Sequence, residues 1–355
     1  MRLFVSAVAI AAFIMTSCQS STNRIGERHG GTLRVNISDI PHSIFPGQVE
    51  KRSEQIIVRQ VYCGLVKYNQ RTLEIVPSIA KDYNISPDEL TYTFSLNTQA
   101  RFPNDRCFAH GKGRRITAAD VKYSIEQICR NKLVDNHGIS SQISNICGAV
   151  DFLQVAKNND SVNIAGIVAK NDSTLIINLK SPDKLFIHFL AGTNALVFAR
   201  EAFNAYGTNG TVGSGPFLFK YPKIIGQTIN LTRNPNYWGV SDDNEQLPYL
   251  DTLALSFITS TQKELYMFGA GLVDAVFDLP TQYLSDFLDA NIDKFKSDSP
   301  RFIMTNTTKP GNDKRFNMYS AEINGLHFNS QTYFDFSTVY LKNPVQHRAE
   351  TAQSE

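Results

Sequence analysis

The sequence lacks a strong excess of charge of either sign and, after its first residues, any long hydrophobic run. Lysine and arginine number 35 and aspartate and glutamate 33, which gives a formal net charge of +2. This near balance excludes the overall basic character by which proteins bind nucleic acid or anionic membranes, so no nucleic-acid partner is expected. No later apolar segment reaches the about 20 residues of a membrane-spanning helix. The hydrophobic fraction of 42% is that of a folded protein.

The sequence also lacks the short motifs that carry hydrolytic chemistry. Gly213-Ser214-Gly215 does not have the frame of a Gly-x-Ser-x-Gly elbow, and no His-Glu-x-x-His occurs. The same glycines are not followed by the Lys-Ser/Thr of a phosphate loop. Cys107 and His110 have a loose metal-like spacing, but no second pair follows. We therefore expect no enzyme, no metal site and no cofactor, with an exported hydrolase as the weakest alternative.

The N-terminal segment is typical of an export signal. Arg2 supplies the positive end, and an apolar run from Leu3 to Met15 ends in Thr16-Ser17-Cys18. The placement of Cys18 resembles a bacterial lipobox, with cleavage before Cys18 and acylation of its thiol. The alternative is an ordinary secretory signal with an incidental cysteine. We predict a signal peptide over 1–17, a lipidated Cys18 and a polar tether over 18–30.

Export permits disulfides, since extracytoplasmic compartments are oxidising. The remaining cysteines are Cys63, Cys107, Cys129 and Cys147. Their sequence positions alone do not determine a pairing.

Apolar residues recur with both strand and helix periods. Alternation predicts strands at 33–37, 92–96, 175–179, 229–231, 253–257 and 273–277. Helical spacing predicts helices at 54–61, 118–130, 185–190 and 262–270. The longest of these begins at Thr117 and Asp120, which have the spacing of a capping box. The interleaved elements indicate a mixed α/β protein.

An ordered series of short motifs is the most informative part of the chain. The longest, from Gly213 to Asp251, reads GSGPFLFKYPKIIGQTINLTRNPNYWGVSDDNEQLPYLD. In it we expect Arg233 to pair with Asp251 or cap a turn, and Tyr237 and Trp238 to pack in the core. Earlier pieces are GGTLRV at 30–35, YCGLVKY at 62–68, VPSIA at 76–80, LTYTFSL at 90–96, ITAADV at 116–121 and DSTL at 172–175.

This series resembles the extracytoplasmic solute-binding proteins of family 5, the oligopeptide- and dipeptide-binding proteins of peptide ABC transporters. The resemblance implies a mixed-sheet, two-lobe periplasmic-binding-protein-like fold. An insertion from Arg106 to Arg115 departs from the family pattern and is expected to alter a surface loop.

Family chains are much longer than this one. Leu326-His327-Phe328-Asn329 resembles the start of the family's second lobe, but residues 346–355 do not continue into its next helix. We expect a C-terminally truncated or frame-shifted member with the second lobe largely missing; the alternative is a natural short variant. The expected division is a first lobe over 31–271, with an inserted subdomain at about 49–180, and the start of the second lobe over 272–355.

The resemblance also implies a function and a site. We expect a substrate-binding lipoprotein, anchored by lipid on the periplasmic side of the envelope, that captures peptides and delivers them to an ABC transporter permease. The family places ligand contacts in the loop after the first strand, which indicates Gln48, Val49 and Glu50. The alternatives are a binding protein for nickel chelates or haem, and a non-functional fragment.

Overall fold

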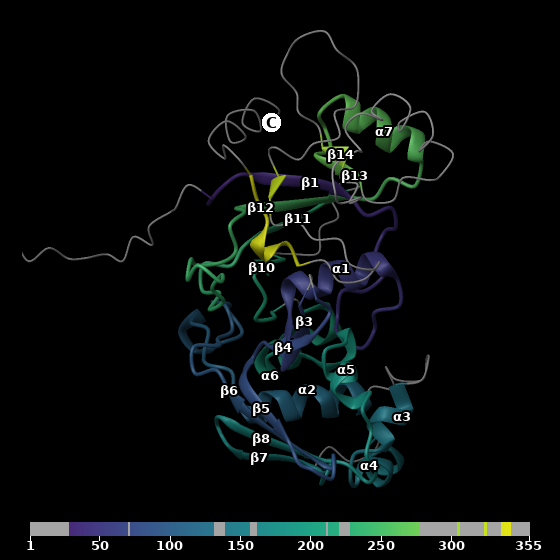
Figure 1. Ribbon diagram of the computed structural model, residues 1–355, viewed down its shortest axis with the longest axis vertical. Coiled ribbons are helices and arrows are strands. Elements are labelled where there is room, and N and C mark those ends of the chain that lie inside the picture. Colours follow the sequence, from purple (N-terminus) through teal and green to yellow (C-terminus); the bar gives the residue numbers. More distant parts are fainter. Residues whose placement is uncertain are drawn as a thin grey trace, which may run out of the picture.

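The computed structural model describes residues 28–69, 72–130, 139–156, 162–210, 212–219, 228–276, 304–305, 323–324 and 335–341 (Figure 1). The predicted signal peptide, Cys18 and most of the tether lie outside these residues, as does Leu326–Asn329. The fold is mixed α/β, as expected from the sequence.

A six-stranded sheet forms the upper part of the molecule in Figure 1. β1 (Thr32–Asn36) lies inside it and pairs in parallel with a strand on either side, so it has no free edge. Its side chains alternate, and Leu33 and Val35 are fully buried. The sheet order is β10 (Phe217–Leu218), β11 (Thr228–Arg233), β12 (Thr252–Ser256), β1, β13 (Ala275–Val276) and β14 (Met304–Thr305).

A four-stranded antiparallel sheet lies at the lower end of the molecule (Figure 1). Its order is β5 (Ala80–Ile85), β6 (Thr91–Leu96), β8 (Thr174–Asn178) and β7 (Ile167–Asn171). Helix α2 (Ala118–Arg130) packs against this sheet through a buried stripe that includes Val121, Ile125 and Ile128. The inserted subdomain and the lobe boundary near residue 271 stay predictions.

Shorter elements join the two sheets, with α1 (Arg52–Val61) between them in Figure 1. Two small antiparallel pairs follow it, β2 (Cys63–Gly64) with β9 (Leu196–Val197), and β3 (Val66–Tyr68) with β4 (Ile75–Pro77). The other elements are α3 (Ile139–Ser144), α4 (Ala149–Val155), α5 (Phe186–Leu190), α6 (Arg200–Tyr206), α7 (Thr261–Gly269), β15 (Ile323–Asn324) and β16 (Tyr340–Leu341).

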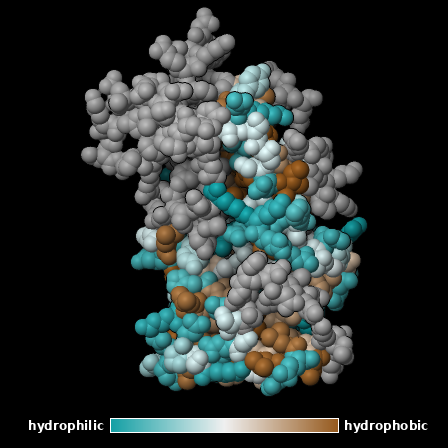
Figure 2. Space-filling model, turned by 90° about the vertical axis from the view of Figure 1, so that its right-hand side faces the viewer, coloured by the Kyte–Doolittle hydropathy of each residue, from teal (hydrophilic) through white to brown (hydrophobic). Residues whose placement is uncertain are grey.

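The described surface carries no large hydrophobic patch on the face seen in Figure 2, and the described cysteines form no disulfide. In Figure 2 the described residues on the visible face are mostly hydrophilic, and hydrophobic ones form small separate patches. Among the described helices, none combines the length and the hydrophobicity needed to cross a membrane. Cys63, Cys107, Cys129 and Cys147 are all free thiols.

The predicted contacts of the Gly213–Asp251 block are confirmed. Arg233 forms an ion pair with Asp251 at 3.0 Å, and its guanidinium also donates to the backbone carbonyls of Tyr249 and Leu250. Tyr237 is buried and Trp238 packs against the core. Arg233 therefore links the end of β11 to residues 249–251.

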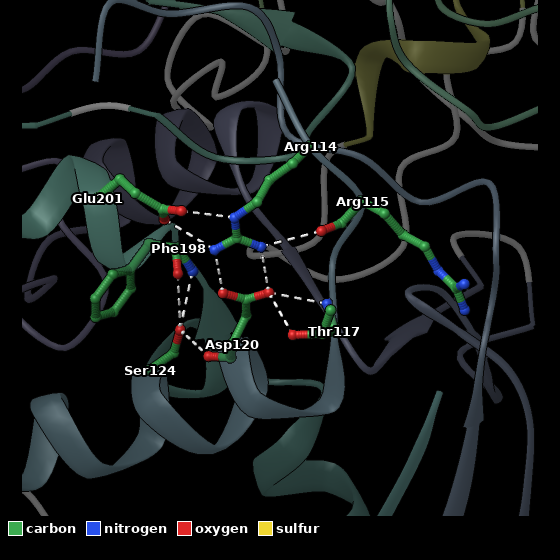
Figure 3. A network of polar contacts seen from close by, with 7 residues as sticks. All are labelled: Arg114, Arg115, Thr117, Asp120, Ser124, Phe198 and Glu201. Carbon is green, nitrogen blue, oxygen red and sulfur yellow. Dashed lines mark hydrogen bonds and ion pairs between the residues drawn. The ribbon is translucent and has the colours of Figure 1, made fainter. Parts of the chain in front are cut away.

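The insertion from Arg106 to Arg115 does more than alter a surface loop. Arg114 donates to both carboxylate oxygens of Asp120 in α2, at 2.6 and 2.7 Å, and to both of Glu201 in α6, at 2.6 and 2.8 Å (Figure 3). Asp120 also accepts from the backbone N–H of Thr117 at 2.9 Å, which confirms the carboxylate half of the predicted capping box. One guanidinium therefore connects the insertion to two helices.

Replacing Arg114 with glutamine is expected to lower the free energy of unfolding by about 2 kcal/mol. Glutamine cannot bridge two carboxylates, and the buried Asp120 would lose its counter-charge, although partial exposure of Arg114 moderates the loss. Urea unfolding followed by circular dichroism measures the difference. The control is Lys81→Gln, because Lys81 is exposed and has no ion pair within the described part of the chain. Equal stability of Arg114→Gln and the wild type would contradict this account.

Candidate functional site

Three parallel strands end at the same edge of the upper sheet. β12, β1 and β13 run in one direction, so their carboxyl ends lie on one side of the sheet. Ligands of open α/β sheets bind outside such carboxyl ends. At this edge the Asn36 side chain links the ends of β1 and β12. Its amide donates to the Ile258 carbonyl at 2.9 Å and accepts from the Ile258 N–H at 2.7 Å. The loop of residues 37–51 leaves from here and forms the candidate site.

A single buried carboxylate organises this loop. Glu54 is 1% exposed and accepts four backbone N–H groups. One oxygen binds those of His42 and Ser43, at 2.7 and 3.3 Å, and the other binds those of Glu50 and Lys51, at 2.8 and 3.0 Å. Burial acts to raise the pKa of Glu54, but the four donors outweigh it and hold the pKa below its ordinary value. The two ends of the loop are therefore tied to one residue of α1.

The predicted contact residues lie together on this loop. The Gln48 N–H donates to the Phe45 carbonyl at 3.1 Å, and its side chain accepts from the Ser43 hydroxyl at 2.9 Å. The N–H of Glu50 is used by Glu54. Within the described part of the chain, the N–H of Val49 between them has no internal acceptor. The role of the three residues in ligand contact stays a prediction.

A separate cavity of about 60 Å³ lies at the other end of α1. Its polar lining includes Arg59, Cys63, Lys67, Ser78, Tyr237 and Asp335. This volume has room for a few waters and is too small for a peptide.

Two charged groups of the cavity, Lys67 and Asp335, form an ion pair. Lys67 donates to Asp335 at 2.9 Å. The Asp335 carboxylate raises the pKa of Lys67, whereas for Asp335 burial is outweighed by Lys67 and Ser337, which lower its pKa. Burial raises the pKa of the Cys63 thiol to about 11, so the thiol stays protonated. Cys63 is therefore not activated as a thiolate nucleophile.

The described residues do not assemble a metal site. No group of three or more His, Cys, Asp or Glu side chains converges within the described ranges. The thiol of Cys107 is partly buried, which raises its pKa to about 12, so it stays protonated too.

Sequence reasoning missed Asn36 and Glu54. Glu54 lies three residues after Lys51, the spacing of a capping box, but lysine at the first position conceals the signal. The role of Asn36 could not be predicted from a local sequence motif, because its partner Ile258 is 222 positions away.

Comparison with known proteins identifies relatives of the chain. The pattern of the bacterial extracellular solute-binding proteins, family 5 (middle region), matches residues 74–317. The oligopeptide-binding protein OppA of Bacillus subtilis is 26% identical over 263 residues, which is 71% of this chain and 45% of that protein. The haem-binding protein A of Haemophilus influenzae is 26% identical over 256 residues, 69% of this chain and 42% of that protein.

The fold also matches solved structures. Haemophilus influenzae OppA in complex with the peptide RPPGFSPFR has a TM-score of 0.61 at 20% identity, and the match covers 74% of this chain and 48% of that structure. The chain spans less than half the length of the curated relatives it matches.

Replacing Glu54 with glutamine is expected to lower the free energy of unfolding by about 2 to 3 kcal/mol. The amide offers one acceptor oxygen where the carboxylate offers two, and its NH₂ group would face backbone donors. Urea unfolding at neutral pH measures this loss. Glu89→Gln, in the turn before β6 and without a side-chain hydrogen bond among the described residues, is the control and should change stability by less than about 0.5 kcal/mol.

The same carboxylate predicts a dependence of stability on pH. Because the folded pKa lies below the ordinary 4.5, the stabilisation is present above pH 4.5 and is lost as pH falls through the folded value. Below pH 4.5 the wild type should lose stability more steeply than Glu54→Gln. Parallel pH profiles of the two proteins would show that Glu54 does not contribute.

Proposed function

Because the chain belongs to family 5 of the bacterial extracellular solute-binding proteins, we propose that it captures peptides outside the cytoplasm and delivers them to the permease of an ABC transporter. The family match over residues 74–317 carries this proposal. It is supported by the Bacillus subtilis relative, named an oligopeptide-binding protein, and by the structural neighbour solved with a peptide. As a solute-binding protein, the chain has a role in capture rather than catalysis.

The candidate site supports a peptide ligand on physical grounds. Peptides of any sequence share a regular series of backbone donors and acceptors, so a receptor that binds the backbone can accept many sequences. The N–H of Val49, which has no acceptor in the described structure, is suited to a peptide carbonyl. Bridging waters can adapt the neighbouring space to varied side chains.

The place of action follows from the family and from the N-terminal sequence. Family 5 proteins are extracellular binding proteins. We propose that export depends on residues 1–17 and that acylated Cys18 anchors the chain to the membrane, as its lipobox-like sequence predicts. The permease would then meet the binding protein at the membrane surface.

Haem is the second candidate ligand. The observation in its favour is the similarity to the haem-binding protein A of Haemophilus influenzae over 69% of this chain. A haem ligand would give a Soret absorbance change on titration, which no peptide gives. Nickel chelates stay an expectation from the sequence.

The full chain is expected to bind short peptides with micromolar affinity in calorimetric titrations against a mixed peptide pool. Val49→Pro, which removes the backbone N–H, should weaken binding by about tenfold, while Val49→Ala keeps that donor and should bind as the wild type does. Unchanged melting temperatures of both variants would exclude misfolding. Absence of heat with the peptide pool, together with a Soret change on adding haem, would favour the second candidate.

A further inference from the structure

The turn of residues 101–115 places two arginines directly opposite each other. Arg101 and Arg115 form an isolated antiparallel bridge. The flanking hydrogen bonds run from the Phe102 N–H to the Arg114 carbonyl and from the Ile116 N–H to the Ala100 carbonyl, both at 2.9 Å. Arg101 and Arg115 are therefore a non-hydrogen-bonded pair, in which side chains are closest, with Cα atoms about 4.5 Å apart. Like charges in this position destabilise a strand pair.

No described carboxylate neutralises this pair. Asp120 and Glu201 are both bound by Arg114, and Asp105 accepts from the Tyr206 hydroxyl at 2.7 Å. In Figure 3 the side chain of Arg115 points away from the Arg114 network. Arg114 and Arg115 are chain neighbours, yet only the first lies among acidic groups.

The arginine pair has donor capacity that the described chain does not use. Arg101 donates to the Gly113 carbonyl at 3.0 Å. The Nε atom of Arg115 is shielded from water and has no acceptor among the described residues. Such a buried donor without a partner is uncommon in folded proteins, because it costs free energy. Lys112, exposed and without an ion pair in the described structure, adjoins Gly113 and adds a third positive charge.

We propose that Arg101 and Arg115, with Lys112 beside them, form a binding site for a phosphate group. Each guanidinium presents a planar fork of N–H donors that matches two oxygens of an oxyanion. A tetrahedral phosphate has enough oxygens to accept from both guanidinium groups, which removes the repulsion between the arginines. A phosphate also carries more negative charge than a single carboxylate, so it compensates more of the positive charge of the pair. The site combines Arg101, which precedes the insertion, with Lys112 and Arg115 of the insertion, and it includes no residue of the loop 37–51.

The test uses the full chain and inorganic phosphate. Phosphate is expected to raise the melting temperature relative to sodium chloride at equal ionic strength, and calorimetry should give a saturable isotherm. The double variant Arg101→Gln/Arg115→Gln should weaken phosphate binding by at least about tenfold, while Lys263→Gln, an exposed lysine on α7, should bind as the wild type does. Without phosphate, Arg115→Gln should melt at or above the wild-type temperature, because a like-charge contact is removed; this separates lost binding from misfolding.

Vesicles then distinguish the two sources of the phosphate group. Co-sedimentation with phosphatidylglycerol vesicles, absent with phosphatidylcholine alone and lost in the double variant, would assign the site to lipid headgroups. Saturable phosphate binding without vesicle binding would assign it to a soluble phosphorylated compound. The proposal is overturned if chloride produces the same stabilisation as phosphate, or if the double variant binds phosphate as tightly as the wild type.

Discussion

The parallel pairing of β1 with β12 is the contact on which the rest of the structure depends. It places Leu33 beside Leu253, so the chain between these strands must leave the sheet and return to it. Closing so long a loop carries an entropic cost that only contacts formed after closure can offset. Asn36 adds to those contacts, because its amide binds both backbone groups of Ile258 and so extends the strand pairing beyond β1. The pairing of β1 with β12 therefore fixes the point from which the loop of residues 37–51 leaves the sheet.

The insertion after β6 shows how a short segment can serve two purposes. Successive residues of a strand point to opposite sides, so Arg114 and Arg115 face different surroundings. Arg114 is surrounded by Asp120 and Glu201 and connects α2 with α6. Arg115 faces Arg101. The first contact stabilises the fold, and the second leaves positive charge uncompensated by the described chain.

Sequence patterns predicted the elements with regular burial and missed those without it. Helix α2 was predicted with its bounds, because Thr117 and Asp120 mark its start and one face is consistently apolar. Strand β5 was missed because it lies at the edge of its sheet and lacks an alternation of apolar and polar residues. Its residues Lys81, Asp82 and Asn84 are polar and exposed. The short helices α3, α4 and α6 and the strand β7 also lack a period long enough to detect.

The candidate site was predicted in part for the same reason. The loop that holds Gln48, Val49 and Glu50 was located through the family resemblance, and the ligand role of these residues stays a prediction. The residue that fixes the loop, Glu54, was missed because it resembles an ordinary helical glutamate. The ion pair of Lys67 with Asp335 was not predictable either, since its partners are 268 positions apart and each looks like a surface charge.

Glu54 holds the loop of residues 37–51 in a way that tolerates changes in the loop's side chains. All four of its donors are backbone N–H groups, so the loop owes this anchoring to main-chain atoms and not to the side chains it displays. Most residue types can therefore replace Gln48, Val49 or Glu50 while the anchor persists; proline at position 50 is an exception, because it lacks an N–H. The three proposed contact residues can therefore change without loss of the hydrogen bonds that hold the loop to Glu54.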